Sequence, residues 1–398
     1  MKTPQTMSLL KRWVPAVDWL GSYRREDLRG DLIAGITVAM MLIPQAMSYA
    51  MLAGLPPSMG LYAAVVPLIV YALLGTSRQL AVGPVAMVAL LVASGVGAIA
   101  EVGSAHYIAL AVLLTLMVGG IQLGMGVFRL GFLTNFMSHP VISGFTSAAA
   151  LIIAFSQLQH IVGLSLPRTE NIALLAYAVL GRLGEVNWVA LAIGVTGIVA
   201  LLALRRVSPL LPGAMVVVVV ATGLVWWLEL NERAGVSVVG SVPAGFPAFS
   251  VPTMTIADLS DLLLIALTIA FIGFIESIAV AKKIAAEKHY DIDPNKELVG
   301  LGMANIAGSF FRAMPVTGGF SRTAVNSNAG ANTGLASLVT AMVIGIALLV
   351  LTPLFYFIPH AILASVIMVA VFGLIDTREV KHLWQVKRED LAMLAVAF

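Results

Sequence analysis

The sequence has 398 residues, of which 60% are hydrophobic and 11% are charged, and its mean hydropathy is +0.98. This composition excludes a soluble globular domain and predicts an all-α polytopic membrane protein, because several runs reach the ~20 apolar residues that cross a bilayer. The net charge of +3 comes from basic residues that are not clustered, so no nucleic-acid partner is expected, and the lack of cysteine excludes disulfides and thiol chemistry.

The hydrophobic runs predict a series of spans that follow a first segment on the membrane surface. Residues 1–30 mix tryptophans with charges and contain no signal-peptide core, so we expect them to lie on the cytoplasmic face. A short interfacial helix near 170–183 and a long loop at 230–257 interrupt the series. Full spans are expected at 31–53, 59–75, 107–127, 139–162, 186–204, 209–229, 258–281, 296–311, 334–357 and 360–375, with half-spans at 84–99 and 321–331.

The positions of the charges predict the orientation and the end of the chain. Only four of the 23 Lys and Arg residues would lie outside the cell, which indicates a multi-pass plasma-membrane protein with a cytoplasmic N-terminus. The last apolar run, 391–398, is too short to cross. We therefore expect the sequence to stop at the start of a further span.

A glycine-rich, polar stretch, Pro315–Asn326, interrupts the apolar runs of the second half. An arginine costs roughly 2.5 kcal/mol or more at a bilayer centre, so Arg322 must face protein or water. Pro315 and the following glycines predict an extended segment, and a short helix then begins near Ser321. The N–H groups of Phe320–Thr323 would point unpaired into a cavity and favour an anion.

The two halves of the sequence contain a weak repeat. Thr37–Ala50 matches Thr268–Ala281 at an offset of 231 residues, and Ser77–Pro84 matches Phe311–Gly318 at an offset of 234. Seven predicted spans separate the copies, so the second copy runs in the opposite direction. Inverted repeats with paired broken helices are typical of secondary transporters, and they predict two half-helices whose N-termini face each other.

Polar residues of the first span form a second group of candidates. Gln45 and Tyr49 share a helix face with Thr37 and Met41, and could place an amide and a phenol beside the half-helices. Alternatively, they hydrogen-bond to neighbouring helices.

Glu276 occupies the position in the second copy that Gln45 has in the first. A carboxylate there is a candidate proton carrier or a counter-charge to Arg322, and the alternative is a static ion pair between the two. Arg322 could hold an anion directly or only supply positive potential. Ser321 could donate to the anion or simply cap its helix.

Other chemistry is not supported by the motifs. The Gly319–Thr323 stretch begins like a serine-hydrolase elbow, but Thr323 replaces the second glycine, so no catalytic residue and no enzyme activity is predicted. The six histidines lack ligand spacing, so neither a metal nor a cofactor is expected. The pair Gly120 and Gly124 is predicted to pack helices.

Several motifs resemble those of one family. Residues 44–62, Gln79–Pro84, His139–Phe145, Pro315–Arg322 and Leu383–Trp384 closely resemble the sulphate permease (SulP) anion transporters, whose animal members include prestin. The resemblance covers essentially the whole sequence.

The resemblance implies a uracil-permease-like fold of fourteen spans in two inverted repeats of seven. A core domain at 31–128 and 258–357 would move against a gate domain at 129–257 and 358–398. The family usually ends in a cytoplasmic STAS domain and forms homodimers, but this sequence contains no STAS domain and lacks the last spans.

The resemblance also implies a set of site residues. Proton-coupled members have a glutamate that matches Glu276. Gly318 and Gly319 depart from several animal members, which have larger or polar residues there. The family's anion pocket maps onto Gln45, Tyr49, Val85, Ala86, Phe320, Ser321 and Arg322.

Together these features predict a secondary active transporter of a small anion, of the dicarboxylate, bicarbonate or sulphate class, coupled to protons through Glu276. There are two alternative transport functions, an uncoupled anion exchanger or channel and a cation-coupled nucleobase carrier. A third alternative is a prestin-like membrane sensor that transports no solute.

Overall fold

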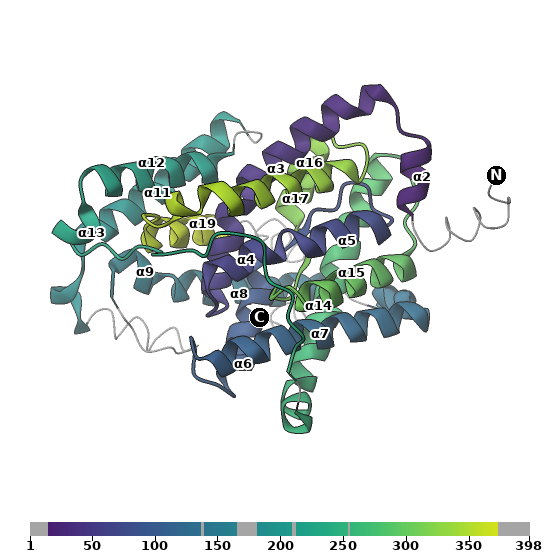
Figure 1. Ribbon diagram of the computed structural model, residues 1–398, viewed down its shortest axis with the longest axis horizontal. Helices are drawn as coiled ribbons and strands as arrows, with labels where there is room; N and C mark the ends of the chain where they lie inside the picture. The colour runs from purple at the N-terminus through teal and green to yellow at the C-terminus, as the bar shows by residue number, and fades with distance from the viewer. Residues whose placement is uncertain (1–14, 137–138, 165–180, 209–211, 254, 373–398) are drawn as a thin grey trace, which may run out of the picture. The chain divides into compact units, whose positions relative to one another are not determined.

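The structure is a computed structural model that describes residues 15–136, 139–164, 181–208, 212–253 and 255–372 (Figure 1). The chain divides into two compact units. The first unit comprises Met1–Thr134, Leu210–Pro212 and Pro243–Leu351, and the second comprises Asn135–Pro209, Gly213–Val242 and Thr352–Phe398. The division into a moving core domain and a gate domain remains a prediction.

The first unit contains most of the helices and both strands. Its elements are α2 (Ala16–Gly21), α3 (Arg25–Leu52), α4 (Pro57–Ala63), α5 (Val66–Leu74), β1 (Val82–Gly83), α6 (Ala86–Gly97), α7 (Ala105–Val127), α14 (Ile256–Glu287), α15 (Pro294–Ser309), β2 (Thr317–Gly318), α16 (Phe320–Asn328), α17 (Leu335–Ile346) and a π-helical turn at Ala347–Leu351.

The second unit is helical in the part that the structure describes. A 3₁₀ segment at Leu130–Phe136 leads into it from the first unit. Its elements are α8 (His139–Ser156), α9 (Leu158–Val162), a 3₁₀ turn at Leu183–Glu185, α11 (Trp188–Val207), α12 (Gly213–Trp227), α13 (Leu230–Arg233), α18 (Thr352–Phe355) and α19 (His360–Phe372).

Six helical segments among the described residues are long and apolar enough to cross a membrane. Each corresponds to a span predicted from the sequence. They are Arg25–Leu52, Pro57–Leu74, Ala105–Val127, Trp188–Val207, Ile256–Glu287 and Leu335–Phe355.

Two of these helices extend beyond the predicted bounds. α3 begins at Arg25 rather than at residue 31, because the carboxylate of Asp27 accepts the backbone N–H of Arg24 at 3.3 Å and so caps the first turn. α14 continues to Glu287, well past residue 281. The end of the predicted surface segment, from Arg25 on, is therefore part of α3. The charged residues between 282 and 287 are part of α14.

Prolines divide two predicted spans into shorter pieces. Pro67 cannot donate a backbone hydrogen bond, and the span 59–75 is accordingly broken between α4 and α5. Pro353 has the same effect on the span 334–357, where the π-helical turn Ala347–Leu351 lies between α17 and α18.

Glycines allow α7 and α15 to pack closely. A Cβ on Gly119 would lie 2.6 Å from the backbone nitrogen of Ile306, and one on Gly302 would lie 2.5 Å from that of Leu123. The prediction for Gly120 and Gly124 is wrong, because a Cβ on either would meet no atom within 4 Å. The helix turns a different face, that of Gly119, toward α15.

Several expectations concern residues outside the described ranges. Most of the short helix near 170–183, the start of a further span after residue 389, and the N-terminal tail before residue 15 belong to this group.

Candidate functional site

The two half-helices start from a pair of antiparallel strands in the first unit. Val82 of β1 pairs with Gly318 of β2, and Gly83 pairs with Thr317. The N–H of Gly319 adds a further bond of 3.1 Å to the carbonyl oxygen of Ala81. The extended segment predicted before the second half-helix is confirmed, and β1 and β2 bring the two half-helix starts together.

Buried side chains fix β2 from one side. Asn305 of α15 accepts the N–H of Val316 at 2.8 Å, and its amide donates to the carbonyl oxygen of the same residue at 3.1 Å. The Asn305 amide also donates to Gln122 of α7 at 3.0 Å. The hydroxyl of Ser277 in α14 accepts the N–H of Gly318 at 2.8 Å. The segment before α16 is therefore bonded to two helices, α14 and α15, and Gln122 of α7 holds Asn305 in place.

Residues of α16 in turn hold the segment before α6. The Thr323 hydroxyl accepts the N–H of Ala81 at 3.0 Å, and the Asn326 amide donates to the carbonyl oxygen of Gln79 at 2.9 Å. Gln79 is 2% exposed and donates to the carbonyl oxygen of Ala331 at 3.0 Å. These hydrogen bonds join the segment before α6 to α16, while Asn326 Oδ1 is buried without a hydrogen-bond partner among the described residues.

The N-terminus of α16 is open to a ligand. The helix begins at Phe320 after the N-cap residue Gly319, which provides no side-chain cap. The sequence predicts that the backbone N–H groups of Phe320–Thr323 all lack an acceptor within the helix. The N–H of Thr323 instead donates to the Gly319 carbonyl oxygen at 3.0 Å, so only the N–H groups of Phe320–Arg322 are left without one. Ser321 is not the cap, and both Ser321 and Phe320 are exposed.

Arg322 connects the two half-helices. Its side chain is 3% exposed, and Nη1 donates a hydrogen bond of 2.7 Å to the carbonyl oxygen of Pro84, just before α6. Nε and Nη2 are buried, and neither has a hydrogen-bond partner among the residues that the structure describes. A guanidinium that is only partly satisfied retains donors and positive potential for an anion.

Glu276 does not form the ion pair with Arg322 that the sequence left open. No carboxylate oxygen of Glu276 lies within 4.0 Å of that guanidinium, and Glu276 Oε2 is buried without a hydrogen-bond partner among the described residues. An ionised carboxylate is costly to bury in this way, so a proton or a cation must compensate it.

Gln45 and Tyr49 lie on α3, which packs against both α6 and α16. Their side chains are 7% and 6% exposed, and within the described part of the chain neither has a hydrogen-bond partner. The structure therefore does not support the alternative in which Gln45 and Tyr49 hydrogen-bond to neighbouring helices. The phenol of Tyr49 lies within electrostatic range of Arg322 and Glu276.

Val85 and Ala86 occupy the start of the first half-helix. Val85 is the extended N-cap residue of α6, and Ala86 is its first helical residue. Both are buried, at 6% and 5% exposure. α14 packs against α6 and α16 as well, so the two half-helices each contact both α3 and α14. Every predicted site residue lies on one of these four helices or at the start of one.

Sequence reasoning missed three residues. The Pro84 carbonyl could not be foreseen as the partner of Arg322. Asn305 could have been noticed as a lone amide in an apolar span. Lys283 Nζ lies 5.1 Å from the ring centroid of Phe320, and its position seven residues after Glu276 on the same helix was an available signal.

Comparison with known proteins identifies the family. Residues 28–397 match the sequence profile of the sulfate permease family. The chain belongs to that family. The resemblance found in the sequence is confirmed, and the family is one of permeases rather than enzymes.

The protein has relatives in plants, bacteria and animals. It is 42% identical over 388 residues to sulfate transporter 4.1, chloroplastic, of Arabidopsis thaliana, which covers 96% of this chain and 56% of that protein. It is 39% identical over 423 residues to the sodium-independent sulfate anion transporter of Bos taurus, which covers 98% and 69%. The probable sulfate transporter Rv1739c of Mycobacterium tuberculosis is 37% identical over 385 residues, covering 97% and 68%. The chain thus spans little more than half of the first relative's length.

Solved structures confirm the fold class of the protein. The structure of SLC26A9 superposes with a TM-score of 0.92 at 26% identity, covering 98% of this chain and 65% of that one. The transmembrane domain of a cyanobacterium bicarbonate transporter, BicA, gives a TM-score of 0.86 at 24% identity, covering 94% and 95%. The polytopic helical fold with inverted halves and two half-helices is therefore that of this chain.

Proposed function

We propose that the protein is a secondary active transporter of a small anion, with sulfate as the first candidate and bicarbonate and dicarboxylates as the others. Membership of the sulfate permease family supports anion transport, and relatives at 37–42% identity are named sulfate transporters. BicA, which shares the fold, is named a bicarbonate transporter.

The observation that carries the proposal is the pairing of β1 with β2, which starts both half-helices side by side. In the proposed complex the anion lies at the N-termini of α6 and α16. The first amides of both helices, together with Arg322, supply donors and positive potential. The proposed contacts are Gln45, Tyr49, Val85, Ala86, Phe320, Ser321 and Arg322.

Proton coupling through Glu276 is part of the same proposal. Its support is that, within the described ranges, the buried Glu276 Oε2 has no hydrogen-bond partner and two nitrogens of Arg322 have none either. An anion that binds near Arg322 would offset its positive charge, and a proton on Glu276 would then accompany the anion across the membrane.

The transport cycle and the setting are proposed from the family. Residues 31–128 and 258–357 would move as a core domain against the rest, exposing the anion to alternate sides. The protein would act as a homodimer in the bilayer of the plasma membrane, with its N-terminus in the cytoplasm.

Uptake into proteoliposomes tests this function. The purified protein would be assayed with radiolabelled sulfate, bicarbonate, succinate and uracil, with and without an inward proton gradient. Saturable sulfate uptake that the gradient stimulates is the expected result. Sulfate exchange unaffected by the gradient would support an uncoupled exchanger, and uptake of uracil alone would support a nucleobase carrier. The absence of any flux would refute transport.

A further inference from the structure

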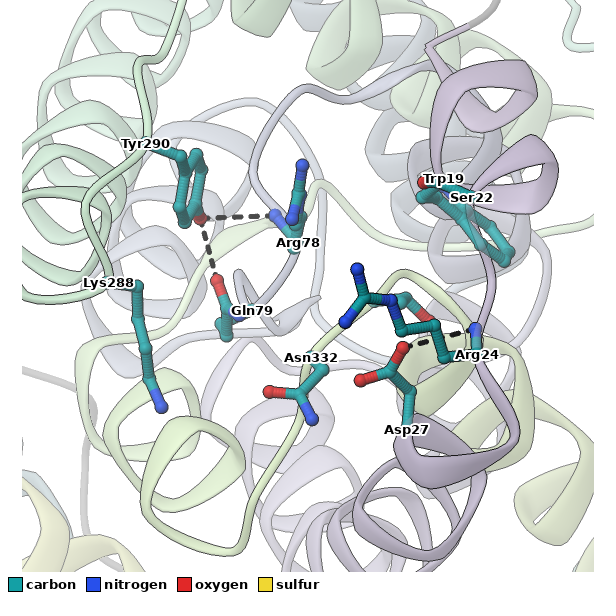
Figure 2. Close-up of a pocket in the computed structure, with 10 residues that line it drawn as sticks. Trp19, Ser22, Arg24, Asp27, Arg78, Gln79, Lys288, Tyr290 and Asn332 are labelled. Atoms are coloured by element: carbon teal, nitrogen blue, oxygen red, sulfur yellow. Dashed lines mark hydrogen bonds between the residues drawn. The ribbon is translucent and has the colours of Figure 1, made fainter.

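A hollow of about 350 Å³ lies in the first unit, and Figure 2 shows the side chains that line it. Asn332, which lines it, follows the C-terminus of α16. That helix has nine residues, and at 1.5 Å per residue it separates the hollow from the first amides by about 13 Å. The hollow is therefore a separate site.

Positive charge predominates in this hollow. Arg24, Arg78 and Lys288 line it, and Asp27 is its one acidic lining residue. Asp27 Oδ2 accepts the backbone N–H of Arg24 at 3.3 Å. Within the described ranges, none of the three cations has a carboxylate oxygen within 4.0 Å. Like charges gathered in one concavity raise the local concentration of anions.

One wall of the hollow is fixed by hydrogen bonds around Tyr290. Its hydroxyl donates to Gln79 Oε1 at 2.7 Å and accepts the N–H of Arg78 at 3.3 Å. The Arg78 guanidinium lies 5.2 Å from the centroid of the Tyr290 ring. Burial raises the pKa of Tyr290, so the phenol stays neutral at neutral pH and adds no negative charge.

Asp31 holds a second part of the wall, formed by Asn332 and Thr333. Its carboxylate accepts the N–H groups of Asn332 and Thr333 at 2.8 and 3.1 Å and the Thr333 hydroxyl at 2.6 Å. The side-chain amide of Asn332 has no hydrogen-bond partner among the described residues, and in Figure 2 it lies between Lys288 and Arg24. It is therefore available as a donor on a fixed loop.

The size and the donors together select a class of ligand. The volume of the hollow falls within the roughly 300–1,000 Å³ that is typical of small-molecule sites. It is larger than the volume of one small oxyanion. A phosphate monoester carries nearly two negative charges and three strong acceptor oxygens, which suit two guanidinium groups and an ammonium. Trp19, 7% exposed, provides an apolar surface for the rest of the molecule.

We propose that this hollow binds a phosphate monoester, from the headgroup of an anionic lipid or from a soluble phosphorylated molecule. The proposal does not depend on the transport function. It nevertheless places the ligand against the start of α3, the segment before β1 and the end of α16, which all lead to the candidate anion site.

Binding by purified full-length protein tests the proposal with two probes. Glycerol 3-phosphate serves as the soluble probe in calorimetry, and nanodiscs of phosphatidylcholine with or without phosphatidic acid serve as the lipid probe in native mass spectrometry. The test variant combines Arg24→Gln, Arg78→Gln and Lys288→Gln. The matched control combines Arg25→Gln, Arg29→Gln and Lys282→Gln, which removes the same charge from exposed positions outside the hollow.

We expect wild type and control to bind at least one probe and the test variant to bind it at least tenfold more weakly. The probe that binds identifies the source of the phosphate. Binding should persist in the Arg322→Ala variant, since the anion site is separate. If the triple variant does not fold, Lys288→Gln is compared with Lys282→Gln. The proposal fails if wild type binds neither probe, if test and control lose equal affinity, or if Arg322→Ala abolishes binding.

Discussion

Arg322 and Pro84 are 238 residues apart in the sequence, yet Arg322 Nη1 donates a 2.7 Å hydrogen bond to the Pro84 carbonyl oxygen. The bond joins the second half-helix to the residue that precedes the first. It uses one nitrogen of the guanidinium, and in the described part of the chain Nε and Nη2 have no partner. A single side chain thus fixes the two helix N-termini relative to each other and still has donors to offer.

Replacing Arg322 should weaken anion binding. Arg322→Ala removes the positive potential and the two free donors, and a charge-assisted hydrogen bond contributes about 1.5–3 kcal/mol, so sulfate affinity should fall about tenfold or more. Titration of purified protein measures this, with the exposed Arg25→Ala as the control. Unchanged affinity in Arg322→Ala would remove this residue from the anion site.

Gly319→Ala should disturb the same guanidinium without removing it. A Cβ at this position would lie 2.6 Å from Arg322 Nη2 and 2.7 Å from Cζ, so the side chain must move away from Pro84. Sulfate uptake should drop severalfold while the protein still folds. Gly97→Ala, where a Cβ would meet nothing within 4 Å, is the control. Equal uptake by both variants would show that the position of Arg322 is unimportant.

Glu276→Gln should uncouple transport from protons. The amide cannot carry a proton across, so uptake driven by a pH gradient should be lost while anion exchange continues. Glu287→Gln, at the exposed end of the same helix, should leave both activities intact. Acid-driven uptake that persists in Glu276→Gln would refute the coupling role.

Glu297→Ala should destabilise the protein strongly. This fully buried carboxylate accepts hydrogen bonds from the Tyr71 hydroxyl at 2.6 Å, from the hydroxyl and N–H of Thr76 at 2.6 Å each, and from the N–H of Ser77 at 3.0 Å. Each donor left unsatisfied costs about 1–3 kcal/mol. The Tm in detergent should fall clearly, whereas that of the exposed Glu101→Ala should not; equal melting would contradict the role of this network.

Neighbouring glycines on α7 should respond in opposite ways to alanine. Gly119→Ala places a Cβ 2.6 Å from the Ile306 nitrogen and should lower the Tm, because backbone atoms cannot yield. Gly120→Ala meets no atom within 4 Å and should be neutral or slightly stabilising, since alanine favours helix by up to about 1 kcal/mol. The reverse order would mean that α7 presents a different face to α15.

Much of the fold could be predicted because its signals are local. Apolar runs indicate spans whatever they pack against, and Pro315 with Gly318 and Gly319 predicts an extended segment wherever it lies. The cost of burying a charge in lipid also required that Arg322 face protein, and this holds for any arrangement of the helices. The membrane class, the half-helices and their polar residues therefore follow from the sequence itself.

Only the tertiary structure decided which groups meet. The sequence allowed Arg322 to pair with Glu276, and the structure instead gives it the Pro84 carbonyl, a group that every residue has and no pattern marks. Gly119 rather than Gly120 packs on α15 because the rotation of a helix about its axis depends on its neighbours. Arg24, Arg78 and Lys288 share one hollow only because separate loops converge there. Such contacts depend on distances between remote segments, which local composition and periodicity do not contain.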